Sequence, residues 1–246
     1  MTLAAALALP TRRDESWRYA DLDALAHLWP LPAVERIAVP AGGSFSRAIV
    51  QDSGGVRQIG LVVGKGASAR MDTLNLGGDY GRIELDVTLH EGAHFELRGV
   101  ILGSGEQVLE IVTTVTHAEP DATSNQTVRT VVGGHATGSY LGKVAVARGA
   151  QKTDAAQSVK AMLLDRTATA NAKPELEIFA DDVKCAHGAT VGELDKAAMF
   201  YLASRGLPPT EAKQLLLQAF VAGVFEGAED EGALTAAALS KLGAMV

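Results

Sequence analysis

Segments in which apolar and polar residues alternate fill the middle of the chain. They are GRIELDVTL at 81–89, HFELRGVIL at 94–102, QVLEIVTTV at 107–115, NQTVRTVV at 125–132, SYLGKVAVA at 139–147, SVKAMLL at 158–164 and PELEIF at 174–179. Alternation with period two and many β-branched residues predicts β-strands. Gly, Asn, Asp or His residues separate the segments, and no long helical pattern lies between them, which argues against a doubly wound sheet.

Three mostly-β architectures fit this pattern: a sandwich, a barrel and a β-solenoid. Glycine is frequent, at 26 of 246 residues, and aromatic residues make up only 5%. A solenoid turns tightly and fills its interior with small and medium aliphatic side chains, whereas a sandwich more often contains large aromatic anchors. The composition therefore favours the solenoid, although no strict sequence repeat is visible.

Helical patterns flank this core and divide the chain into three regions. Residues 1–40 form a helical lead-in that Pro30 and Pro32 end. Residues 41–192 form the β core, and residues 193–246 are helical. In this last region Asp195 is placed to cap a first helix, a second begins near Thr210, and an alanine-rich third spans 234–242.

The second of these helices is apolar on two sides. One apolar stripe at helical spacing consists of Ala212, Leu215, Leu216, Ala219, Phe220 and Val224. Three further apolar residues widen it to most of the helix circumference, and these are Leu217, Val221 and Phe225. Such a helix must bury two faces. Either it is clamped between the β core and its neighbours, or one face binds a partner protein.

Charge and cysteine content exclude several classes of protein. The net charge of −7 argues against nucleic-acid or anionic-membrane binding, and no apolar run could span a bilayer. The apolar start precedes Arg12 and Arg13, the reverse of a signal peptide, so a cytoplasmic location is expected. A single cysteine, Cys185, cannot form an intramolecular disulfide or an all-cysteine metal site.

Two motifs could carry chemistry. His90-Glu91-Gly92-Ala93-His94 matches the zinc-protease pattern H-E-x-x-H, which would make the protein a zinc-dependent hydrolase. That pattern needs a helix, and the strand-like flanks and Gly92 predict a turn instead. No phosphate-binding loop occurs, so the chain is not expected to hydrolyse ATP itself. His27, His117 and His135 stand singly and are expected at the surface or in turns.

The second motif is the polar run at 181–190, which contains Lys184, Cys185 and His187. On a strand, Cys185 and His187 share one face, and a thiolate with an imidazole suits iron or zinc. Lys184 is placed to lower the pKa of the thiol. Two ligands do not complete a metal site, so a partner chain, a second copy or an exogenous thiolate would have to supply the others.

The chain resembles the SufB/SufD family of the Suf iron–sulfur cluster assembly system. The resemblance rests on ADDVKCAHGATVGELD at 180–195, on FYLASRG at 200–206, on the run GAQKTDA at 149–155 with Gln157, and on ESWRYADL at 15–22. The ESWRYADL segment resembles the opening of SufD members, and the single cysteine also favours SufD over SufB, so the chain is most like a short SufD. Known SufD chains usually have a larger N-terminal region, so a compact or shortened SufD is expected.

This resemblance implies a right-handed parallel β-helix that acts as a non-ATPase scaffold and not as an enzyme. The implied partners are a SufB-like scaffold, bound through the ends of the β-helix, and a SufC-like ABC-type ATPase, bound through residues 193–246. The residues implied to contact the ATPase are Phe200, Tyr201, Arg205, Leu215, Leu216 and Phe220. His187 and Cys185, with Lys184 beside them, would hold a transient iron–sulfur cluster at the partner interface. A structural solenoid that only forms a homodimer is the third hypothesis.

Overall fold

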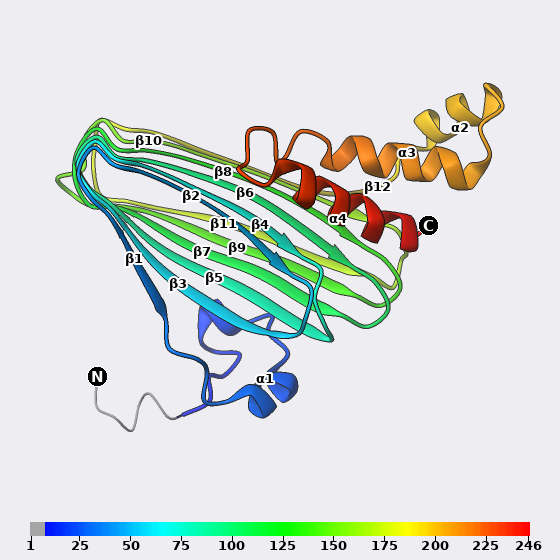
Figure 1. The fold of residues 1–246 in the computed structure, drawn as a ribbon, viewed down its shortest axis with the longest axis horizontal. Coiled ribbons are helices and arrows are strands. Elements are labelled where there is room, and N and C mark those ends of the chain that lie inside the picture. The colour runs from blue at the N-terminus through cyan, green and yellow to red at the C-terminus, as the bar shows by residue number, and fades with distance from the viewer. Residues whose placement is uncertain (1–7) are drawn as a thin grey trace.

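Two parallel β-sheets coil around one apolar interior in the computed structural model, which describes residues 8–246 (Figure 1). Sheet A contains β1 (Glu35–Val39), β3 (Gly55–Val63), β5 (Tyr80–Leu89), β7 (Val108–His117), β9 (Thr137–Val146) and β11 (Thr169–Ile178). Sheet B contains β2 (Ser44–Gln51), β4 (Ser68–Asn75), β6 (His94–Gly103), β8 (Thr123–Val132), β10 (Asp154–Leu163) and β12 (Lys184–Glu193). Successive strands alternate between the sheets, so the predicted β-helix is confirmed.

A stacked turn of one kind joins sheet A to sheet B in the first five coils, from β1–β2 to β9–β10. One residue of the turn has a positive φ angle, and these residues are Gly42, Gly66, Gly92, Asp121 and Lys152. The amide of each of them donates to a carbonyl of the next turn, as Gly66 N does to Glu91 O at 2.8 Å. Glycine adopts this left-handed conformation without a steric penalty, which accounts for part of the glycine-rich composition.

The core lies between the two sheets and consists of the inward-facing alternate residues. Met71, Ile83, Phe95, Leu97 and Ile111 are among its fully buried members. Tyr140 is the largest aromatic residue there, and Gly142 leaves room for its ring, because a Cβ at position 142 would lie 2.1 Å from Tyr140 Oη. The scarcity of aromatic residues thus matches a narrow interior.

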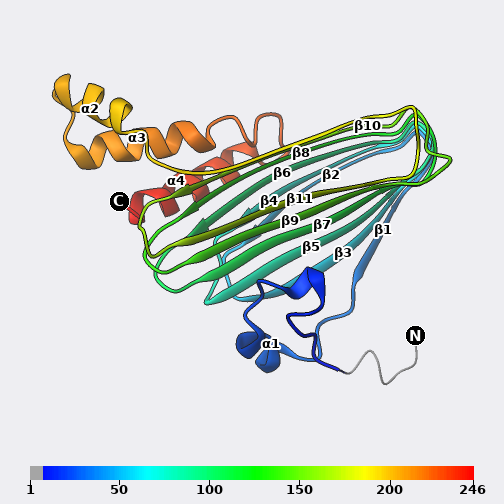
Figure 2. The ribbon, with the colours of Figure 1, turned by 180° about the vertical axis from the view of Figure 1, so that it is seen from behind.

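Three helices follow sheet B, and the last two of them cover its outer face, whereas the first extends beyond it (Figures 1 and 2). They are α2 (Lys196–Ser204), α3 (Pro209–Val221) and α4 (Glu231–Ala244). Asp195 caps α2 as predicted, because its carboxylate accepts from Ala197 N and Ala198 N. The second helix is shorter than its apolar stripe: α3 ends at Val221, and Val224 and Phe225 lie in the following turns, where they pack against sheet B.

The N-terminal segment lies on the outer face of sheet A. It contains a short 3-10 helix, η1 (Glu15–Trp17), and α1 (Leu22–Leu28), which Asp21 caps. Trp17, Leu22 and Leu25 pack with Val56 and Tyr80 of the sheet. Residues 1–7 of the expected lead-in lie outside the described part of the chain.

Candidate functional site

Cys185 and His187 lie on β12, the last strand of sheet B. They are in register with Ala155 and Gln157 of β10, whose side chains are buried in the interior. Because alternate residues of a strand share a face, both side chains point toward the end of the β-helix interior. Cys185 is half-buried and His187 is exposed. The predicted sharing of one face is therefore confirmed.

The environment of Cys185 keeps its thiol protonated. Burial raises the pKa of the thiol above its ordinary value, and the nearby carboxylate of Asp154 raises it further. Lys184 is the adjacent residue on the strand, so its side chain points to the opposite face. The expectation that Lys184 lowers the pKa of Cys185 is wrong, because burial and the negative charge of Asp154 dominate.

A buried polar cluster lies directly beneath His187. Gln157 donates from Nε2 to Gly142 O at 3.1 Å and to Tyr140 Oη at 3.3 Å. Tyr140 Oη donates to Gln126 Oε1 at 2.9 Å, and Thr113 Oγ1 donates to the same oxygen at 2.8 Å. Within the described residues, Gln157 Oε1 is buried without a hydrogen-bond partner. The sequence singled out Gln157 only through the family resemblance.

The last coil leaves both sheets open at one edge. In the part of the chain that the structure describes, β11 pairs only with β9, and β12 pairs only with β10. Apolar side chains at this end are exposed: Ile178 by 38%, Phe179 by 60% and Val191 by 48%. Unpaired edge strands with exposed apolar side chains can pair with another chain.

The two histidines of HEGAH do not form a metal site. His90 to Ala93 make the turn between β5 and β6, where Gly92 has a φ of 64°. His90 Nδ1 lies 3.1 Å from Glu119 Oε1, and His94 Nδ1 lies 2.7 Å from Thr123 Oγ1. Over residues 8–246, no group of three or more His, Cys, Asp or Glu side chains could hold a metal ion. The predicted turn is confirmed, and the helix that a zinc protease needs is not formed.

The residues expected to bind an ATPase differ in exposure. Phe200 on α2 is 76% exposed and Tyr201 is 56% exposed, with the Arg205 guanidinium 5.2 Å from the Tyr201 ring centroid. On α3, Leu215 is 46% exposed, while Leu216 and Phe220 are half-buried. α2 has no buried residue and lies beyond the body of the β-helix (Figure 2).

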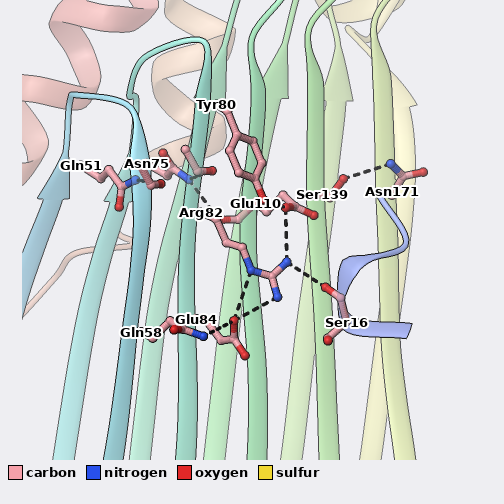
Figure 3. Close-up of polar contacts among 12 residues, drawn as sticks. Ser16, Gln51, Gln58, Asn75, Tyr80, Arg82, Glu84, Glu110, Ser139 and Asn171 are labelled. Atoms are coloured by element: carbon pink, nitrogen blue, oxygen red, sulfur yellow. Dashed lines mark hydrogen bonds and ion pairs between the residues drawn. The ribbon is translucent and has the colours of Figure 1, made fainter. Parts of the chain in front are cut away.

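A buried ionic network, which the alternating pattern did not predict, anchors the N-terminal segment (Figure 3). The Arg82 guanidinium donates to Ser16 O at 2.8 Å, to Glu110 Oε2 at 3.3 Å and to Glu84 Oε2 at 3.1 Å. It also lies 3.8 Å from the Trp17 ring centroid. The segment ESWRYADL is therefore fixed to β5 by a cation–π contact and a hydrogen bond.

Burial governs the ionisation of this network. Burial raises the pKa of Glu110, and the positive charge of Arg82 partly opposes that rise. Burial also raises the pKa of Tyr80, whose hydroxyl donates to Glu110 Oε2 at 2.9 Å. Outward positions on a strand are ordinarily solvated, so only the folding of the N-terminal segment over sheet A explains why Arg82 is fully buried.

His117 is a further buried titratable group, and its expected position was wrong. It ends β7 and faces the interior, where its Nε2 lies 2.9 Å from Ser124 Oγ. Burial lowers its pKa to about 4, so the imidazole is neutral at physiological pH.

No helix in the described residues is long and apolar enough to cross a membrane.

Comparison with known proteins identifies the family. Residues 36–220 match the family model of the SUF system FeS cluster assembly, SufBD core domain. The chain is 35% identical over 176 residues to an iron–sulfur cluster assembly SufBD family protein of Synechocystis sp. The aligned region covers 71% of this chain and 39% of that protein. It is 34% identical over 173 residues to the iron–sulfur cluster assembly protein SufD of Escherichia coli. That aligned region covers 70% of this chain and 41% of that protein.

A third relative is the iron–sulfur cluster assembly protein SufD of Bacillus subtilis, which is 31% identical over 58% of this chain and 32% of that protein. The chain therefore spans about two fifths or less of the length of these curated relatives. The family model covers well over half of the chain and coincides with the β-helix and the start of its helical cover. The chain belongs to the SufBD family of iron–sulfur cluster assembly proteins.

Proposed function

We propose that this protein is a non-catalytic scaffold subunit that assembles iron–sulfur clusters together with a SufB-like scaffold and a SufC-like ATPase in the cytoplasm. The observation that carries the proposal is the open last coil, where Cys185 and His187 share a face of an unpaired strand. A two-ligand pair at an uncovered end is the arrangement expected when a partner supplies the remaining ligands.

In this proposal the cluster is cargo that is held only transiently. The His187 imidazole is exposed and can bind iron or move a proton at the interface. Cys185 is a secondary ligand, because its raised pKa disfavours the thiolate that binds metal. Lys184 faces away from this pair and could contact the partner instead.

The SufB-like partner would extend the sheets at β11 and β12 and cover Ile178, Phe179 and Val191. The SufC-like ATPase would bind α2 and the exposed side of α3, through Phe200, Tyr201, Arg205, Leu215, Leu216 and Phe220. Large exposed aromatic residues are frequent among the residues that dominate binding energy at interfaces. ATP-driven movement of the helices could then reach the β-helix end through Leu194 and Asp195, which join β12 to α2.

Coexpression with SufB-like and SufC-like proteins tests the cluster site. We expect His187→Ala to leave the complex intact but to reduce its iron and sulfide content, measured by chemical analysis and visible absorption. The matched control is His135→Ala, which removes an exposed histidine from the turn between β8 and β9. Equal cluster content in the two variants would remove His187 from the mechanism.

Two double variants test the assignment of partners to surfaces. Phe200→Ser with Tyr201→Ser should abolish copurification of the ATPase and retain the SufB-like protein. Phe179→Ser with Val191→Ser should have the opposite effect. If the unaltered chain forms a homodimer and copurifies with neither partner, the result would contradict the proposal and favour the structural solenoid.

A further inference from the structure

A second polar site lies on the outer face of sheet B, away from Cys185 and His187. A cleft of about 400 Å³ separates the sheet from the end of α3 and the loop that follows it, over residues 219–224. Its polar lining consists of Arg98 on β6, Thr127 and Arg129 on β8, and Lys160 on β10. We call this the basic cleft.

The basic cleft has more positive than negative charge. Arg129 and Lys160 are in register on neighbouring strands, and Arg98 is in register with Thr127. Glu96 forms an ion pair with Arg98, at 2.5 Å between Oε1 and Nε. Within residues 8–246, neither Arg129 nor Lys160 forms an ion pair. Three cations and no carboxylate therefore line the cleft, in a chain whose net charge is −7.

Arg129 is held in place by neutral groups. Its Nη1 donates to Val128 O at 3.0 Å and to Ser158 O at 2.9 Å, and Ser158 Oγ lies 3.4 Å from both Nη atoms. Burial and the like charge of Arg98 lower the pKa of Arg129. The guanidinium is thus fixed in position, while no carboxylate of the described residues forms an ion pair with it.

The end of α3 does not balance this charge. A helix C-terminus carries about half a negative charge, which is less than the excess on Arg129 and Lys160. The hydrogen bonds of Arg129 also go to carbonyls of sheet B and not to those of α3. An arginine fixed in this way beside a lysine and a hydroxyl is a typical arrangement for binding an oxyanion.

We propose that the basic cleft binds a phosphate-type oxyanion, with Arg129 and Lys160 as the charged ligands and the Thr127 hydroxyl as a further donor. The oxyanion is either free phosphate or the phosphate of a nucleotide, because the polar groups recognise that shared chemistry. This inference does not depend on the proposed role in cluster assembly.

Isothermal titration calorimetry of the full chain at constant ionic strength tests this proposal, with inorganic phosphate, pyrophosphate and ADP as the probes. We expect one saturable site. Lys160→Gln should weaken binding about tenfold, a loss of about 1.4 kcal/mol, through removal of one charged ligand. Lys160 is exposed, so this variant should fold. Arg148→Gln is the matched control, because it removes an exposed charge from the turn before β10, and it should keep the affinity within twofold.

The results separate the sources of the oxyanion. Equal affinity for phosphate and ADP would indicate a site for phosphate alone, and tighter ADP binding that Lys160→Gln weakens would indicate a nucleotide. Arg129→Gln, checked for folding by circular dichroism, should lose binding in either case. Absence of saturable binding for all three probes, or equal affinities in Lys160→Gln and Arg148→Gln, would overturn the proposal.

Discussion

Gln157 and His187 are direct neighbours on adjacent parallel strands, yet one is buried and the other is exposed. Gln157 is 4% exposed and hydrogen-bonded to Gly142 O and Tyr140 Oη, whereas His187 lies at the open end above it. The boundary between the packed interior and the surface available to a partner therefore runs between these two residues.

This boundary predicts different effects of substitution on the two sides. Gln157→Leu should lower the free energy of unfolding by about 1–3 kcal/mol, because it leaves buried polar groups without partners. His187→Ala should change it by less than about 0.5 kcal/mol, as exposed substitutions usually do. Urea denaturation of both variants measures the difference. Equal losses would mean that His187 is part of the core, and that any loss of cluster content in His187→Ala results from destabilisation of the fold.

Buried His117 should make stability depend on pH. Its pKa of about 4 in the folded state is below the ordinary value of 6.5, so the unfolded chain takes up the proton first. This contribution to stability is complete above pH 6.5 and is lost as the pH falls toward 4, at up to about 1.4 kcal/mol per pH unit.

Urea unfolding of the wild type and of His117→Asn between pH 7.5 and pH 4.5 checks this expectation. The difference between the two free energies of unfolding isolates His117 from the carboxylates that titrate in the same range. The variant should show a shallower fall with decreasing pH. Parallel pH profiles would contradict a neutral buried imidazole.

Arg82→Met should destabilise the protein by about 3–5 kcal/mol near neutral pH, because it leaves the Glu110 carboxylate buried without its positive partner. Burial has already raised the pKa of Glu110, so the stability associated with its protonated form is present at low pH and lost as the pH rises through the folded-state pKa. The deficit of Arg82→Met relative to wild type should therefore shrink as the pH falls.

Denaturation at pH 7.5 and pH 5 measures that deficit. As a control, adding Glu110→Gln to Arg82→Met should recover part of the loss at pH 7.5, because it removes the buried charge. A deficit that is independent of pH, with no recovery in the double variant, would show that packing against Trp17 and not the charge dominates.

Lys152→Gly should stabilise the protein by about 0.5–1 kcal/mol, because Lys152 has a φ of 60° and glycine adopts that conformation without a steric penalty. The backbone hydrogen bond from Lys152 N to Asp182 O is kept in the variant. Thermal and urea unfolding measure the gain. Arg148→Gly is the control in the same turn and should not stabilise, since position 148 has no positive φ to relieve. A loss of stability in both variants would contradict the explanation.

The sequence predicted the regular part of this fold because each coil repeats the same local chemistry. Alternation at 81–89 and 94–102 corresponds to β5 and β6, and the same rule placed Cys185 and His187 on one face. His117 was misplaced although the alternation of β7 continues through Val115 to position 117. Following that period for one further step would have put the imidazole inside.

Other features could not be obtained from local pattern. Arg82 occupies an outward strand position, and its burial depends on Ser16 and Trp17, which are distant in the chain. The pKa of Cys185 is likewise raised by burial and by Asp154 on the neighbouring strand, whereas sequence adjacency suggested an effect of Lys184. Both cases depend on contacts that form only when the coils stack.

The ion pair between Lys173 and Glu15 joins the last coil to the N-terminal segment, across 158 residues of sequence. In a simple solenoid each coil contacts only its neighbours, so the terminal coil can unfold independently of the rest. Here the N-terminal segment is held at Arg82 on β5 and also at Lys173 on β11. Fraying of the last coil must therefore break a contact with the opposite end of the chain, which makes unfolding of the coil that carries Cys185 and His187 more cooperative with the rest of the molecule.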